Sequence, residues 1–236
     1  MKNARIATKF LTIAGRFGAA PGAPEQIGRA AIYFPFVGFA IGLGLIVLNR
    51  LLGRALESEI EAAVLVFALI IVTAAIHLEG LQKTTDLLVA RRHKIDHLSA
   101  GTVYGMIAVV LVIIFKIRAI EVMGETRSIH LLLAPALARW ALVVFLYGPN
   151  LESEDLAWRV AKQVTAWHLF VATAVTLAIT IYLTGRAGLW VGLTISIVAL
   201  LFRAYCQRQV SEISHHRFGA LIEVSETLSL VLFASL

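Results

Sequence analysis

Long apolar runs separated by short polar stretches form the main pattern of this 236-residue sequence. A helix of about 20 apolar residues can cross the hydrocarbon core of a membrane while pairing its backbone polar groups internally. The pattern therefore predicts an all-α, polytopic integral membrane bundle of about seven transmembrane helices. We expect these helices near residues 31–49, 62–76, 103–120, 129–148, 167–184, 187–202 and 219–236.

The composition supports a membrane protein over a soluble one. Apolar residues make up 59% of the chain and charged residues 15%, with a mean hydropathy of +0.83, whereas a soluble domain is about 45–50% apolar and about 25% charged. We expect an N-terminal interfacial segment over residues 1–30 and a single transmembrane helical domain over residues 31–236, with a polar loop at 77–102. The single Cys206 excludes an internal disulfide and a cysteine-based zinc site.

Lysine and arginine are unevenly distributed between the two sides of the predicted bundle. Seven spans place the N-terminus and the loops 77–102, 149–166 and 203–218 on one side, with 14 of these cations against six on the other; Arg139 lies within a span. Because the cation-rich side faces inward, we expect the N-terminus and the 77–102 loop in the cytoplasm, at the inner or plasma membrane. The net charge of +6 then fits contact with anionic headgroups, and no nucleic-acid partner is expected.

The first 30 residues carry basic side chains around a short apolar patch, residues 10–13, followed by the helix-breaking sequence AAPGAP. This pattern predicts a short amphipathic helix that lies on the membrane surface. The sequence leaves open whether this segment also contributes to a substrate pocket.

The stretch from His77 to Gly105 concentrates charged side chains between two apolar spans. A charge at the edge of the hydrocarbon costs about 3 kcal/mol unless it is paired, hydrated or bound to an ion, so we expect the functional site here. In a helix that continues from the second span, Glu79, Lys83 and Asp86 share one face. Two carboxylates on one face can hold Mg²⁺ together with substrate phosphates. Alternatively, Glu79 and Lys83 form an ion pair and Asp86 is solvated.

Two glutamates of the last predicted span, Glu223 and Glu226, share a helix face at i, i+3. Pairing them with Arg139 would offset the cost of burying each charge alone, and such a cluster is either a structural clamp or the wall of a polar pocket. We expect Lys116 to extend its ammonium group to the membrane surface. No zinc site is expected, because the HExxH-type spacing is missing among the cytoplasmic histidines His77, His93, His97, His215 and His216.

Four motifs occur in order along the chain: YFPFVG at residues 33–38, HLEGL at 77–81, LLAPALARW at 132–140 and GALIEVSE at 219–226. They resemble the motifs YFPxVG, HLDGL, LLAPALGRW and LGAxxExxE of the cobalamin-5′-phosphate synthases, which are adenosylcobinamide-GDP ribazoletransferases. The order and spacing of the resemblance extend along nearly the whole chain.

The acid-rich motif of that family, HLDGLADTADG, is altered in this sequence. Glu79 stands in place of the first aspartate and keeps its charge, Lys83 replaces the second and reverses it, and Asp86 matches the third. The family's TGD before the last span ends here in His216, and its DSRxGxxG segment reads SAGTVYG, with Ser99 in register. An ammonium group in place of an acid is a first-order electrostatic change at a diphosphate–metal site.

The resemblance implies a magnesium-dependent membrane transferase of cobalamin (vitamin B12) biosynthesis. Such an enzyme joins adenosylcobinamide-GDP to α-ribazole or α-ribazole 5′-phosphate and releases GMP. A second copy of the chain or other enzymes of corrinoid assembly are the protein partners to expect. The resemblance points to Glu79, Lys83, Asp86 and Arg139 as catalytic residues, to His77, Ser99, His216, Glu223 and Glu226 as substrate-binding residues, and to Glu79, Asp86 and Asp96 as magnesium ligands.

Three other functions stay open at this point. The chain could be a family member that has lost catalysis and binds a corrinoid or a partner enzyme at the membrane, since Lys83 and His216 replace acids. It could be a CDP-alcohol-type phosphotransferase, because DLLVAR at residues 86–91 resembles part of DGxxAR; Leu87, however, replaces the glycine. A transporter is disfavoured, because no spans resemble matched halves with broken helices.

Overall fold

The computed structural model describes residues 2–15, 22–93, 101–148, 156–208 and 216–236, and every regular element within these ranges is helical. The α-helices are α1 (Lys2–Leu11), α2 (Pro24–Arg29), α3 (Phe34–Leu52), α4 (Ser58–Val72), α5 (Ile76–His93), α6 (Val103–Val122), α7 (Arg127–Leu146), α8 (Leu156–Ala161), α9 (Ala166–Thr184), α10 (Arg186–Arg208) and α11 (His216–Ser235). Short 3₁₀ turns are η1 (Ile13–Gly15), η2 (Ala31–Tyr33) and η3 (Gly124–Thr126). The predicted all-α fold is confirmed.

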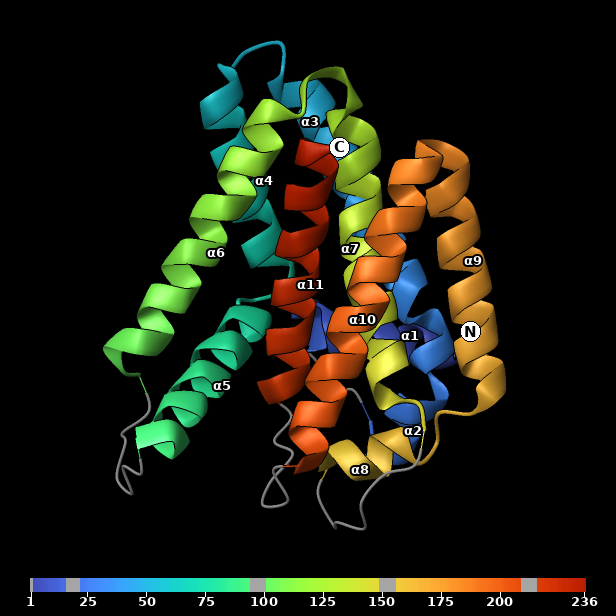
Figure 1. Cartoon of the computed structure of the whole chain (residues 1–236). Helices are drawn as coiled ribbons and strands as arrows, with labels where there is room; N and C mark the ends of the chain where they lie inside the picture. Colours follow the sequence, from blue (N-terminus) through green and yellow to red (C-terminus); the bar gives the residue numbers. More distant parts are fainter. Residues whose placement is uncertain (1, 16–21, 94–100, 149–155, 209–215) are drawn as a thin grey trace.

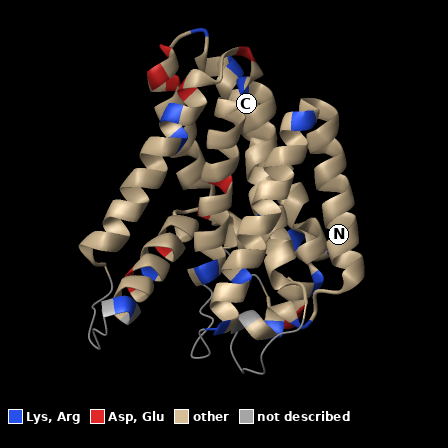
Figure 2. Ribbon diagram, viewed as in Figure 1, with Lys and Arg blue, Asp and Glu red and all other residues tan. Residues whose placement is uncertain are grey.

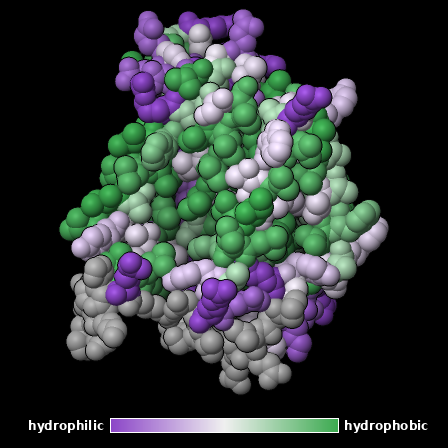
Figure 3. Space-filling view, viewed as in Figure 1, coloured by the Kyte–Doolittle hydropathy of each residue, from purple (hydrophilic) through white to green (hydrophobic). Residues whose placement is uncertain are grey.

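The long helices form a membrane-spanning bundle. Six of the described helices are long and apolar enough to cross a membrane, and the bent pair α4–α5 raises the number to seven if it counts as one span. The face of the bundle seen in Figure 3 carries a broad apolar band, and most charged residues lie toward the two ends of the bundle (Figure 2). Because a bilayer requires an apolar band of this kind, the chain is a multi-pass membrane protein, as predicted.

One end of the bundle carries the two shortest α-helices, α2 and α8, each of six residues. Helices α2, α5 and α8 and the beginning of α11 lie at this end, and the C-terminus lies at the other (Figure 1). Helix α2 of the N-terminal segment and helix α5 after the second span, which belong to regions that the sequence assigns to one side, therefore share one end of the structure (Figure 1). We call it the short-helix end.

Helix α7 is the centre of the bundle, with 16 of its 20 residues buried. It packs against α3, α9, α10 and α11. Helix α3 approaches it closely, because a Cβ on Gly38 would lie 2.4 Å from the Pro135 carbonyl oxygen and one on Gly42 would lie 2.6 Å from that of Leu132. The apolar core thus forms around a helix that is shielded from lipid.

The second predicted span is broken. Residues 73–75 separate α4 from α5, and the two helices meet at an angle of 86°. Ala74 and Ala75 have φ values of 50° and 56°, a left-handed conformation that costs a residue with a side chain about 1–2 kcal/mol. The prediction of one helix continuing from the second span is therefore wrong. Most of the predicted loop at 77–102 is helix α5 instead, because this segment packs along α11 and α6.

The N-terminal helix α1 is packed into the bundle. Its apolar side buries Ile6 and Leu11, and the Phe10 ring stacks on Phe34 at 5.7 Å and meets the edge of Phe218 at 6.3 Å. These contacts join α1 to α3 and α11. The segment that the sequence assigns to the membrane surface therefore also forms part of the protein interior.

Candidate active site

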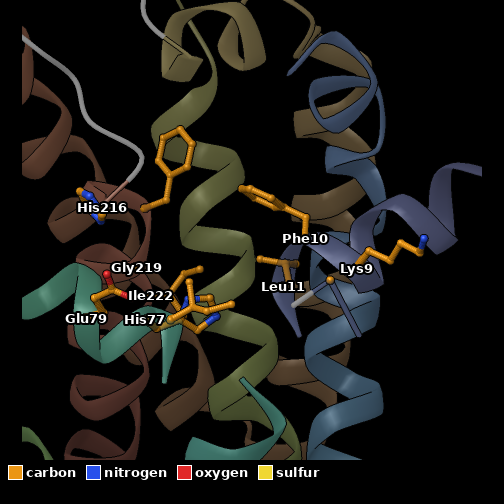
Figure 4. Close-up of a pocket in the computed structure, with 11 residues that line it drawn as sticks. Lys9, Phe10, Leu11, His77, Glu79, His216, Gly219 and Ile222 are labelled. Carbon is orange, nitrogen blue, oxygen red and sulfur yellow. The ribbon is translucent and has the colours of Figure 1, made fainter. Parts of the chain in front are cut away.

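A cavity of about 330 Å³ lies between the N-terminal segment and helices α5 and α11. Phe10 and Leu11 line one side, and His77 and Glu79 of α5 and His216 of α11 line the other (Figure 4). These residues are far apart in the sequence and only the fold brings them together. The N-terminal segment therefore contributes to a pocket, which is the possibility that the sequence leaves open.

Helices α5 and α11 are in direct backbone contact beside this cavity. A Cβ on Gly80 would lie 2.4 Å from the carbonyl oxygen of His216, and a Cβ on Gly219 would lie 3.0 Å from the Cα of His77. Because no side chain separates the helices at this point, His77 and Glu79 are held beside the first turn of α11. The HLEGL and GALIEVSE motifs thus form one helix crossing.

Glu79 and His216 line the cavity, and Lys83 beside it contacts both of them; we call these three side chains the cavity group. Lys83 Nζ lies 2.6 Å from Glu79 Oε1 along α5 and 3.5 Å from His216 Nε2 on α11. The ion pair that the sequence offers as an alternative is confirmed. Because lysine only donates, His216 Nε2 must be the unprotonated ring nitrogen for its contact to be a hydrogen bond. The Glu79 and Lys83 side chains are 42% and 34% exposed, so water and ligands can reach both.

Asp86 is buried and caps the start of α6. Its Oδ2 accepts hydrogen bonds from the backbone N–H groups of Gly101, at 3.0 Å, and Thr102, at 3.2 Å. Its Oδ1 accepts from the N–H of Gly105 at 3.0 Å and from the Thr102 hydroxyl. A carboxylate is favourable at a helix N-terminus, where N–H groups lack partners within the helix. The alternative in which Asp86 is solvated is therefore wrong.

The donor set does not fit a magnesium ion held between Glu79 and Asp86. A carboxylate has about four lone-pair sites, and the Asp86 oxygens already accept four hydrogen bonds. The Lys83 ammonium group already pairs with Glu79. The other predicted ligand, Asp96, and the predicted substrate-binding Ser99 lie outside the described residues. Among the residues that are described, no three His, Cys, Asp or Glu side chains are grouped to hold a metal, and magnesium dependence stays a prediction.

A second set of charges lies inside the bundle, where α6, α7 and α11 contribute Lys116, Arg139, Glu223 and Glu226; we call it the buried cluster. Lys116 Nζ lies 2.6 Å from both Glu223 Oε2 and Glu226 Oε1, and Arg139 Nη1 pairs with Glu226 Oε2. All four side chains are at most 5% exposed. Two cations balance two carboxylates, which is the condition for burying charges in a membrane protein.

Of the two predictions about residues of the buried cluster, one is confirmed and one is wrong. Arg139 pairs with Glu226, as predicted. The prediction that Lys116 reaches the membrane surface is wrong, because its ammonium group pairs inside the bundle with both glutamates. Two glutamates and one arginine within spans leave one negative charge without a partner, and this imbalance is the signal that could have indicated Lys116. Neither Glu223 nor Glu226 belongs to the described lining of the cavity.

A second hollow, of about 440 Å³, lies between α2 and α8 at the short-helix end. Its lining includes Glu25, Arg159 and Lys162, and Lys162 Nζ lies 4.9 Å from the centre of the Trp158 ring. A backbone hydrogen bond and then the bond from Arg159 lower the pKa of the Glu25 carboxyl. Its described lining contains none of the four motifs, so we assign the candidate site to the first cavity.

Comparison with known proteins gives a family and named relatives. The family described as cobalamin-5-phosphate synthase matches residues 3–234. Proteins named adenosylcobinamide-GDP ribazoletransferase are similar: that of Pseudomonas fluorescens is 28% identical over 88% of each chain, and that of Roseiflexus sp. is 29% identical over 95% of this chain and 86% of its own. That of Pseudomonas putida is 30% identical over 86% of each chain. No solved structure matches significantly.

Proposed function

The chain belongs to the cobalamin-5-phosphate synthase family, and on this premise we propose that it joins adenosylcobinamide-GDP to α-ribazole or α-ribazole 5′-phosphate and releases GMP. It is a membrane transferase of cobalamin biosynthesis. The relatives that are named for this activity match it over most of their own length.

One observation supports the location of the site. The HLEGL and GALIEVSE segments meet at the Gly80–Gly219 contact, and the residues around this contact line one cavity with the N-terminal segment. A cavity of about 330 Å³ is at the small end of ligand pockets, which measure about 300–1,000 Å³. It can admit a nucleoside or a diphosphate, and the much larger corrin ring would lie outside it.

The transfer exchanges one phosphorus–oxygen bond for another. A hydroxyl of α-ribazole bonds to the phosphorus that carries the cobinamide chain, the bond from that phosphorus to the bridging oxygen breaks, and GMP leaves with that oxygen. The hydroxyl loses its proton, and the Glu79 carboxylate in the cavity wall is our candidate acceptor. Lys83 lies beside Glu79. Its positive charge would stabilise the negative charge that develops on the departing phosphate.

We further propose that the short-helix end faces the cytoplasm at the inner or plasma membrane. The larger number of lysines and arginines assigned to this side supports the orientation. Arg159, at this end, and Arg186, at the other, are both exposed, and Cys206 is buried. In whole cells, an impermeant thiol reagent should label Arg186→Cys and not Arg159→Cys; the reverse pattern would invert the orientation. A second copy or another corrinoid-assembly enzyme as partner stays a prediction.

The proposed activity can be tested directly. The purified full chain in lipid nanodiscs, given adenosylcobinamide-GDP, α-ribazole 5′-phosphate and magnesium, should form the joined corrinoid and release one GMP for each product molecule. Mass spectrometry and a GMP assay measure the two yields. Binding of both substrates without product, under conditions where the Pseudomonas putida relative turns over, would support the alternative of a corrinoid-binding protein without catalysis.

A further inference from the structure

A lysine, Lys83, lies next to the polar wall of the cavity. Lys83 Nζ lies within 3.5 Å of two groups that line the cavity, the carboxylate of Glu79 and the ring of His216. The lysine of the described lining, Lys9, extends away from Glu79 and His216 (Figure 4). An anion that enters along this wall would therefore meet the Lys83 ammonium group.

Asp86, the acid that follows Lys83 along α5, caps helix α6 and is not available to bind a cation. Asp86 is 5% exposed, and its two oxygens accept four hydrogen bonds at the start of α6. A cation bound to Asp86 would have to displace these donors and leave buried N–H groups without partners, which is costly. The acid on the other side of Lys83, Glu79, already pairs with an ammonium group, and a divalent ion placed there would be repelled by it.

A fixed ammonium group and a bound metal ion can do the same electrostatic work for a diphosphate. Both neutralise phosphate oxygens, and lysine is a common phosphate ligand in proteins. Lysine provides a single positive charge and three donors, and it needs no carboxylate ligands. Lys83, between Glu79 and His216, can bind a phosphate in this way. One of its donors is directed to Glu79, and its side chain remains 34% exposed.

We propose that Lys83 takes the place of a divalent cation in this chain, and that the cavity binds the diphosphate of its substrate through this ammonium group without a metal ion between Glu79 and Asp86. This inference rests on the proposed transferase function and specifies how its diphosphate is held. Lys83 is then a binding residue for the leaving GMP moiety, and Asp86 is an architectural residue.

The test uses inorganic pyrophosphate as the probe and the full chain in detergent. Calorimetry should give a dissociation constant for the wild type that changes by less than about threefold between excess chelator and millimolar Mg²⁺. Because a charge-assisted hydrogen bond is lost, Lys83→Met should weaken binding by about tenfold or more. Lys83→Arg should keep most of the affinity. Lys162→Met, a matched change at an exposed lysine in the turn after α8, should leave the affinity unchanged.

A second measurement detects the metal itself. Electron paramagnetic resonance should show no stoichiometric Mn²⁺ site in the wild type, whereas Lys83→Asp, which removes the ammonium group and adds an acid, should bind Mn²⁺ more tightly. Size-exclusion profiles confirm that each variant is folded. Stoichiometric Mn²⁺ in the wild type, tenfold weaker pyrophosphate binding after chelation, or unchanged binding by Lys83→Met would each overturn the proposal.

The outcome for the transferase function is separate. Product formation that requires Mg²⁺ would overturn the role of Lys83 and leave the transferase function intact. Pyrophosphate binding that depends on Lys83, combined with no product under any condition, would support this binding site and overturn the transferase function.

Discussion

The buried cluster and the cavity group contain the same kinds of side chain in opposite surroundings. Every member of the buried cluster is at most 5% exposed, and its cations and carboxylates balance. In the cavity group, Glu79 and Lys83 are 42% and 34% exposed. An unpaired charge inside a membrane protein is expensive, so the buried cluster needs every partner. The cavity group can lose a partner to water or to a substrate, and its charges are available for chemistry.

The largest expected effect comes from breaking the buried cluster. Glu226→Leu removes the carboxylate that pairs with both Lys116 and Arg139, and it should lower the free energy of unfolding by about 3–5 kcal/mol because two buried cations lose a partner. Denaturant titration in detergent micelles measures this change. The same substitution in the cavity group, Glu79→Leu, should cost about 1 kcal/mol or less. Equal losses at the two sites would remove the distinction between them.

The helix crossing that positions the cavity group gives the next largest effect. Gly80→Ala places a methyl group 2.4 Å from the His216 carbonyl oxygen, and overpacking of this kind costs about 1–3 kcal/mol. Since Glu79 lies next to it, the transferase rate should fall as well. Gly44→Ala is the control, because nothing lies within 4 Å of a Cβ at that position. It should be neutral or slightly stabilising, and comparable losses for both variants would contradict the close contact between α5 and α11.

Substitutions of Asp86, which caps α6, distinguish an architectural role of this residue from a metal-binding role. Asp86→Ala removes the acceptor of four hydrogen bonds and should destabilise the protein by about 0.5–2 kcal/mol. Asp86→Asn keeps an oxygen acceptor at the helix start, where asparagine also caps well, so it should recover most of this stability and most of the activity. Parallel unfolding curves and rate measurements provide the data. A stable Asp86→Asn protein without activity would indicate that the carboxylate charge itself takes part in catalysis.

The smallest expected effect is at the break between α4 and α5. Ala74 has a φ of 50°, which glycine adopts without the clash of a side chain, so Ala74→Gly should raise the free energy of unfolding by up to about 1 kcal/mol. The matched control is Ala62→Gly inside α4, which should lower it by about 1 kcal/mol. Thermal unfolding of both variants shows whether the two changes in the free energy of unfolding have opposite signs. Destabilisation by Ala74→Gly would contradict the left-handed conformation at this position.

The apolar runs predicted the spans well because bilayer thickness sets both their length and their composition. The break after Val72 was not predictable, since alanines at positions 74 and 75 favour helix and carry no glycine or proline signal. The role of Asp86 depends on residues 15–19 positions away in the chain, which no local pattern indicates. The pairing of Arg139 with Glu226 could be predicted, because buried charges in a membrane protein require partners.

We conclude that the cavity group carries out the chemistry and that the buried cluster stabilises the bundle. The most direct test is the rate of GMP release by folded Glu79→Gln protein, compared with the wild type in the same nanodiscs. We predict a rate lower by about 100-fold or more, as expected for the loss of a proton acceptor, with a free energy of unfolding within about 1 kcal/mol of the wild type. A Glu79→Gln protein that releases GMP at the wild-type rate would contradict the claim.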